Sequence, residues 1–224
     1  MSKKFYGLLL PALAILAFAS MGGAAQAAKF EICTNAAGHV GKFETHACKL
    51  PEVTGGTFGW LVIGETKQAV VTHGTLTLHA LGITITCTVK DAGVIWNNSA
   101  GEGRDEITVF TNEKCKASNE EAPPKGCPTP TIEALGLPWQ TALVAGTPIR
   151  DKIAGIQVEL ACAGSAVGVF EGSLTPEIVN GSPTEAVFGA GSGELEEPIA
   201  KLKATVTGSD AMELANGWAV RVHS

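Results

Sequence analysis

Apolar and polar residues alternate along two segments of the chain, residues 83–89 and 156–162. In the first, Ile, Ile, Cys87 and Val occupy every second position and threonines stand between them. In the second, Ile, Val, Leu and Cys162 likewise occupy every second position. A period of two is typical of a strand with one buried and one solvated face. Both cysteines are therefore predicted to point into the core of a β domain.

Further short apolar runs separated by turn formers predict more strands, while no amphipathic helical period longer than two turns occurs after residue 27. The fold class expected is all-β, an antiparallel β-sandwich-like domain stapled by disulfides. The order Cys87, Trp96, Cys162 mimics an immunoglobulin-like core. Leu160 stands where the tyrosine corner of that fold needs Tyr, so a sandwich is predicted but an immunoglobulin domain is not.

The C-terminal segment predicts a hairpin with the three-residue loop Ala215-Asn216-Gly217. This loop places Leu214 opposite Trp218, whereas a two-residue loop would mix acidic and apolar side chains on one face. Gly217 is expected at positive φ.

The first 27 residues read as a secretory signal peptide. Lys3 and Lys4 precede a short apolar run that Pro11 interrupts, and the segment ends in Ala25-Gln26-Ala27. The prediction is therefore a secreted, extracellular β domain over residues 28–224 without a transmembrane anchor. A polar, proline-rich stretch near residues 122–130 is a candidate subdivision of that domain.

Charge and composition narrow the range of partners. The chain has 16 basic and 22 acidic residues, so without Lys3 and Lys4 the formal charge is 14 − 22 = −8. No run of basic residues occurs, so nucleic acid is a poor partner for this surface. No cofactor is indicated.

Six cysteines, an even number in an exported chain, indicate disulfides. Cys33 with Cys48 and Cys115 with Cys127 each bracket a short polar loop, which leaves Cys87 for Cys162. The pair at 33 and 48, together with His39 and His46, offers an alternative zinc site. Because the spacing matches no common zinc motif and the compartment is oxidising, the disulfide is preferred and no metal is predicted.

Three segments carry a resemblance to known proteins: TCTVKDAGVIWN, DEITVFTNEKCKA and EALGLPWQTALVAGTPIRDKI. They resemble a family of uncharacterised secreted all-β proteins of high-GC Gram-positive bacteria. The resemblance covers the middle and later half of the chain. It implies export and an all-β domain, and it assigns no activity, ligand or catalytic residue.

Catalytic motifs of the common hydrolases and nucleotide-binding folds are absent, so no catalytic residue is predicted. Glu194 and Glu196 lie two residues apart on one face of a predicted strand, a spacing that a glycosidase could use. A solvated strand edge gives the same pattern. Enzyme activity therefore stays open, and a secreted hydrolase acting on polysaccharide through loop carboxylates is the alternative function.

Four tryptophans invite a sugar-stacking hypothesis, because their rings offer flat apolar area with one polar atom. Trp60, Trp96 and Trp218 lie in apolar strand patterns and are predicted to be core residues. Trp139 lies in a proline-broken segment and is the candidate exposed binding residue. The first hypothesis is thus a non-catalytic domain with a binding or structural role, whose partner is a cell-wall or extracellular glycan or protein.

Overall fold

The structure is a computed structural model that describes residues 27–36, 41–118, 127 and 129–224. The predicted signal peptide, apart from Ala27, lies outside these residues, as does most of the stretch at 122–130. The described residues form strands and no helix. The strands are β1 Lys29–Asn35, β2 Phe58–Val62, β3 Gln68–Ala80, β4 Ile83–Asn97, β5 Gly103–Ala117, β6 Pro130–Leu135, β7 Trp139–Val144, β8 Arg150–Cys162, β9 Ser165–Leu174, β10 Glu177–Val179, β11 Thr184–Phe188, β12 Glu194–Glu197, β13 Leu202–Leu214 and β14 Val220–His223.

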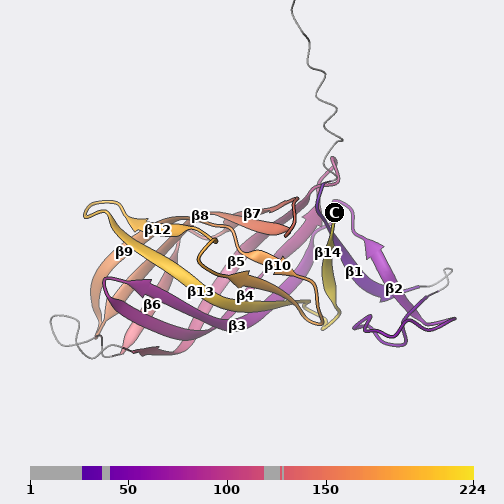
Figure 1. The fold of residues 1–224 in the computed structure, drawn as a ribbon, viewed down its shortest axis with the longest axis horizontal. Coiled ribbons are helices and arrows are strands. Elements are labelled where there is room, and N and C mark those ends of the chain that lie inside the picture. The colour runs from indigo at the N-terminus through magenta and orange to yellow at the C-terminus, as the bar shows by residue number, and fades with distance from the viewer. Residues whose placement is uncertain (1–26, 37–40, 119–126, 128) are drawn as a thin grey trace, which may run out of the picture.

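The long strands form a closed antiparallel barrel with eight strand positions (Figure 1). β3, β4 and β5 are consecutive neighbours, and β13 closes the sheet by pairing with β3 from Ala204↔Ala80 to Leu214↔Val70. The prediction of a sandwich was therefore wrong. Alternating residues show that one face of a sheet is buried, but they do not show whether that face packs on a second sheet or on itself.

Three of the eight positions hold two short strands placed end to end. β6 and β7 both pair with β8 on the side nearest β5. β11 and β12 both pair with β13, and β9 and β10 both pair with β8 on its other side. The strands on either side of residues 122–130 therefore belong to the same barrel.

A second, three-stranded sheet in the order β14-β1-β2 lies at one end of the barrel (Figure 1). Its inner face carries Phe30, Val220 and Val222, which are buried against barrel residues such as Ile95 and Leu214. No helix long and apolar enough to cross a membrane occurs in the part of the chain that the structure describes.

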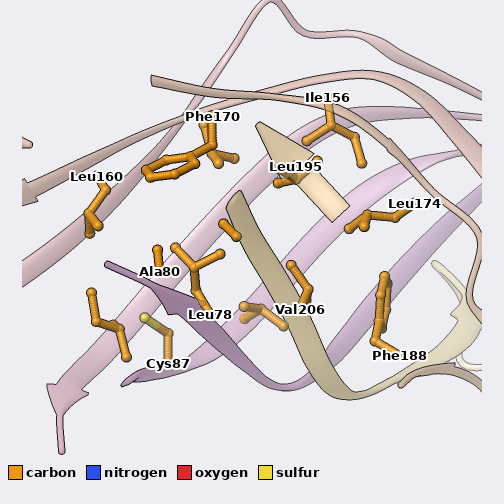
Figure 2. Packing of buried hydrophobic residues seen from close by; sticks show 14 of the residues in the cluster. Leu78, Ala80, Cys87, Ile156, Leu160, Phe170, Leu174, Phe188, Leu195 and Val206 are labelled. Carbon is orange, nitrogen blue, oxygen red and sulfur yellow. The ribbon is translucent and has the colours of Figure 1, made fainter. Parts of the chain in front are cut away.

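The period-two pattern that predicted β4 and β8 is confirmed. Cys87, Val89 and Leu160 are at most 2% exposed and belong to one core cluster. Cys87 and Leu160 point into the barrel with Phe170 (Figure 2). Closing the sheet removes this inner face from water without a second layer, so each strand needs only one apolar row.

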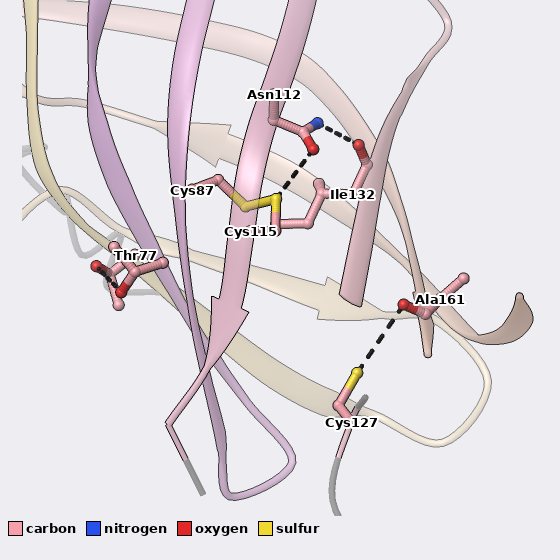
Figure 3. Close-up of a disulfide and its surroundings, with 8 residues drawn as sticks. Thr77, Cys87, Asn112, Cys115, Cys127, Ile132 and Ala161 are labelled. Atoms are coloured by element: carbon pink, nitrogen blue, oxygen red, sulfur yellow. Dashed lines mark hydrogen bonds between the residues drawn. A yellow bond between two sulfur atoms is a disulfide. The ribbon is translucent and has the colours of Figure 1, made fainter. Parts of the chain in front are cut away.

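Cysteine pairing follows the strand register. Cys33 bonds to Cys48 as predicted, but the other two predicted pairs were wrong: Cys87 bonds to Cys115. Cys115 lies within β5, beside β4, and a bulge in the register brings its Cα to 4.1 Å from that of Cys87 (Figure 3).

The third disulfide joins Cys127 to Cys162, with their Cα atoms 4.9 Å apart. Pro130, at the start of β6, lies opposite Cys162 at the end of β8, which brings the chain just before β6 close to that cysteine. Cys87 and Cys162 do share the inner side of the sheet, but they lie on strands that are not neighbours in the barrel.

The C-terminal hairpin is confirmed in detail. The Leu214 and Trp218 main chains are hydrogen-bonded, Glu213 pairs with Ala219, and Gly217 has a φ of 79°. Register follows the buried face here, because Leu214 and Val220 both pack between the barrel and the small sheet.

Candidate functional site

An open groove of about 540 Å³ lies along the small sheet, at β2. Trp60 and Leu61 of β2, Asn35 at the end of β1, Arg221 of β14 and Lys42 contribute to its lining. A volume of this size is in the range of small-molecule sites, and the lining combines aromatic, aliphatic and charged side chains.

Trp60 is held in this groove from two sides. The Arg221 guanidinium carbon lies 4.4 Å from the centre of the indole, and Arg221 Nε donates to Glu31 Oε2 at 2.6 Å. Phe43 meets the indole edge to face, with ring centres 6.5 Å apart. Since the Cys33–Cys48 disulfide packs beside Phe43, the floor of the groove is fixed by packing and by a covalent bond.

The rim of the groove is polar and carries both signs of charge. Lys42 Nζ lies 3.3 Å from Glu52 Oε2, and both side chains are more than half exposed. An exposed ion pair of this kind contributes little stability, so the two groups remain free to contact a ligand.

A second polar feature lies inside the barrel, where the two apolar clusters meet. Six inward-facing residues on six strands lie at similar depth and form what we call the aspartate–threonine ring: Thr72, Asp91, Asp105, Thr141, Asp151 and Asp210. The four aspartates and Thr72 line a cavity of about 50 Å³.

The ring consists of two similar halves. Thr72 on β3 lies opposite Asp91 on β4, and Asp210 follows on β13. Thr141 on β7 lies opposite Asp105 on β5, and Asp151 follows on β8. Each half thus places a threonine between two carboxyl groups on three adjacent strands.

Burial makes these carboxyl groups weak acids. In the first half, burial and then the neighbouring Asp210 raise the pKa of Asp91 to about 9. Burial also raises the pKa of Asp210, although Thr72 and Asp91 oppose this shift. Two carboxyl groups this close do not both ionise readily, so this half retains a proton at neutral pH.

The second half behaves in the same way. Burial and then Asp151 raise the pKa of Asp105 well above its usual range, and burial raises that of Asp151 to about 6. One oxygen of each ring carboxyl is buried without a hydrogen-bond partner among the described residues. The cavity can therefore hold a buried water, which normally bridges such atoms.

Among the residues that the structure describes, no group of three or more His, Cys, Asp or Glu side chains is arranged to hold a metal ion. The alternative zinc site near the N-terminus is wrong, because Cys33 and Cys48 are bonded to each other; His39 lies outside the described residues.

Trp139, the predicted surface binding residue, is buried at 4% exposure, so that part of the prediction was wrong. Its Nε1–H donates to the Leu135 carbonyl at 3.0 Å, and its ring lies 5.6 Å from that of Phe110. The turn between β6 and β7 folds the indole inward, where it lines an almost wholly apolar cavity of about 80 Å³.

Trp60 and Trp218 pack against hydrophobic clusters, in line with the prediction of core residues, whereas Trp96 was misplaced by the sequence pattern. Trp60, Trp96 and Trp218 are only half-buried. Trp96 is in the outward row of β4, where the Lys67 ammonium lies 4.6 Å from its ring centre. Trp218 stacks on His46, with ring centres 6.4 Å apart.

The predicted carboxylate pair lies on the outside of the barrel. Glu194 Oε2 is 2.6 Å from Lys203 Nζ, and Glu196 Oε1 is 3.0 Å from Lys201 Nζ. In the register, Glu196 lies opposite Glu171 on β9, and these two line a shallow depression. Gln157 donates to Glu171 at 3.1 Å, so the described structure gives each of these acids a partner.

Comparisons with protein-family models, with curated proteins and with solved structures found no match to this chain.

Proposed function

We propose that this protein is a non-catalytic, secreted binding protein that holds an extracellular ligand in the groove beside Trp60. The observation that carries the proposal is the groove itself, a ligand-sized opening with an anchored indole and a polar rim. Three disulfides are typical of proteins that fold in an oxidising compartment, and they support a role outside the cell.

A neutral, polyhydroxylated ligand such as a cell-wall glycan fits this groove best. The indole offers flat apolar area, and Asn35, Lys42 and Glu52 offer hydrogen-bond donors and acceptors. Because the rim carries a lysine and a glutamate side by side, a ligand of strong single-sign charge gains little there. An extracellular protein remains the second class of partner.

A hydrolase is the less favoured candidate. Glu171 and Glu196 lie together only in a shallow depression, with an amide and an ammonium as their partners. A general acid of this kind sits in a pocket that excludes water, whereas this depression is shallow and open.

The test is binding of the folded protein, residues 28–224, to a glycan array and to isolated cell walls. We expect Trp60→Ala to lower binding at least tenfold, because the indole is the apolar platform of the groove. Trp96→Ala is the matched control, since this indole is also half-buried and also has a cation over its ring.

Lys42→Ala separates an effect on binding from an effect on folding, because this side chain belongs to the same rim but is 64% exposed. We expect this variant to weaken binding several-fold with an unchanged melting temperature. Wild-type protein that binds no glycan or wall preparation, or Trp60→Ala and Trp96→Ala proteins that bind alike, would refute the proposed role of the groove.

A further inference from the structure

Among the residues that the structure describes, no strand covers the outer edge of β2 from Trp60 to Val62. Hydrogen bonds from Ala36 N–H to the Thr57 carbonyl and from Ile63 N–H to the Phe30 carbonyl fix which groups of β2 face β1. In an antiparallel pair these groups alternate, so residues 59 and 61 also face β1 and residues 58, 60 and 62 face away. Phe58 confirms this parity, because both its N–H and its carbonyl bond to Phe43.

The outward main-chain groups of Trp60 and Val62 have no hydrogen-bond partner in the described structure. Leu61 and Val62 are also 53% and 45% exposed. The strand Phe58–Val62 contains no charged residue and no proline, which are the usual features that protect an edge from pairing with another chain.

The opposite edge of the same sheet is covered. Asn180 bonds to both main-chain groups of Val222 in β14, and the Thr184 hydroxyl donates to the Val220 carbonyl. The barrel sheet closes through the pairing of β13 with β3, although β5 pairs with β7 only from Arg104 to Ile107. Within the described part of the small sheet, the open edge therefore lies on β2 and not on β14.

We propose that β2 pairs antiparallel with β2 of a second copy of this chain, about a two-fold axis at Leu61. In this register Trp60 bonds with Val62 of the partner subunit, and Val62 bonds with Trp60 of the partner subunit. All four unpaired groups of each edge are then used, and the two small sheets become one continuous six-stranded sheet.

A second copy suits this edge because the edge is complementary to itself. Leu61 meets Leu61 of the partner subunit, so two exposed apolar side chains cover one another and no like charges come together on the strand. Only a short strand takes part, so the interface falls at the small end of the range for specific complexes and the association is weak and reversible.

Leu61→Cys tests the register directly. Residues on the two-fold axis form a non-hydrogen-bonded pair, whose Cα atoms lie about 4.5 Å apart. That distance is within the disulfide range. We expect oxidised Leu61→Cys protein to form a covalent dimer on non-reducing gels, much faster than Ile199→Cys protein, whose side chain is 90% exposed away from β2.

Sedimentation of the wild-type protein over a hundredfold concentration range gives the second readout. We expect a monomer–dimer equilibrium that Leu61→Lys abolishes, because it places two ammonium groups on the axis, while Leu50→Lys, also at an exposed leucine, leaves it intact. A wild-type protein that stays monomeric, or Leu61→Cys and Ile199→Cys proteins that crosslink at equal rates, would overturn the proposal. The proposal would also be overturned if the β2 edge binds a foreign peptide while the wild-type protein does not self-associate.

Discussion

The inside of the barrel has two regions that meet different demands. One region is filled by apolar side chains such as Leu160 and Phe170, both fully buried. One disulfide beside it joins β4 to β5, and another joins Cys127, before β6, to the end of β8. The other region is the aspartate–threonine ring, where four carboxyl groups lie in an environment nearly as dry. β3, β4, β8 and β13 contribute to both regions, so along these strands the difference lies in which residue occupies each inward position.

This contrast shows how a buried acid is accommodated. On β4 the inward row runs from Cys87 and Val89 to Asp91. Asp91 has a carboxyl group and a hydroxyl beside it, so it can stay protonated next to polar atoms, whereas a carboxyl at residue 89 would be surrounded by hydrocarbon.

Val89→Asp should therefore give the largest effect. Moving a carboxyl two residues along the inward row leaves it without a polar partner, and it must be buried as a neutral acid. Holding it neutral at pH 7 costs about 4 kcal/mol, and the lost apolar burial adds about 2 kcal/mol. We expect the variant to be largely unfolded at neutral pH, as measured by urea unfolding and protease resistance.

Val89→Thr is the control for this change, because it has nearly the same shape and adds a hydroxyl without an acid. It should remain folded with a smaller loss. If Val89→Asp protein is as stable as Val89→Thr protein at neutral pH, the two regions do not differ in the way described.

The second prediction concerns pH. The folded-state pKa values of Asp91 and Asp151, about 9 and about 6, lie above the ordinary value of 3.8, so the folded protein holds more protons than the unfolded chain. The stability that these groups contribute is present in full below about pH 4 and is lost as pH rises through 6 and then 9. Each retained proton changes the free energy of unfolding by about 1.4 kcal/mol per pH unit.

Asp91→Asn combined with Asp105→Asn should flatten this profile, because an amide resembles a neutral acid. We expect the advantage of the double variant over wild type in free energy of unfolding to grow by roughly 5 kcal/mol between pH 5 and pH 9, since the proton that Asp91 retains contributes about 1.4 kcal/mol per pH unit over this range. Urea unfolding at the two pH values measures this difference. Equal slopes of stability against pH in the two proteins would contradict the pKa assignments.

The sequence predicted the strands well because alternation is local. It placed β4, β8 and the C-terminal hairpin correctly, including the loop of residues 215–217. It did not predict the closure of the barrel or the disulfides of Cys87 and Cys162, since both depend on which strands become neighbours. The periodicity within one strand does not indicate which other strands will be its neighbours in a closed sheet.

The candidate sites were missed for a different reason. Asp91 has the same parity as Cys87 and Val89, so the alternation already indicated that its side chain points inward, and Trp96 has the opposite parity. The sequence alone could therefore have placed Asp91 inside the sheet and Trp96 outside it. The groove at Trp60 was not predictable, because Asn35, Lys42 and Arg221 come together only through the small sheet.

The smallest effect is expected from Thr141→Val, which probes the comparison within the ring. The Thr141 hydroxyl has no hydrogen bond of good geometry, yet it lies near enough to Asp151 to keep the pKa of that carboxyl below the value that burial alone would set. Without it the pKa of Asp151 should rise above about 6, while the free energy of unfolding should change by less than about 1 kcal/mol, because an unpaired hydroxyl is replaced by a methyl group of similar size. Carboxyl-carbon NMR titration would measure the shift.

Thr72→Val serves as the comparison, since it should move the titration of Asp91 and Asp210 and leave that of Asp151 in place. A titration of Asp151 that stays at wild-type pH in Thr141→Val protein would show that burial alone sets its acidity, and that the threonines of the ring act only as spacers.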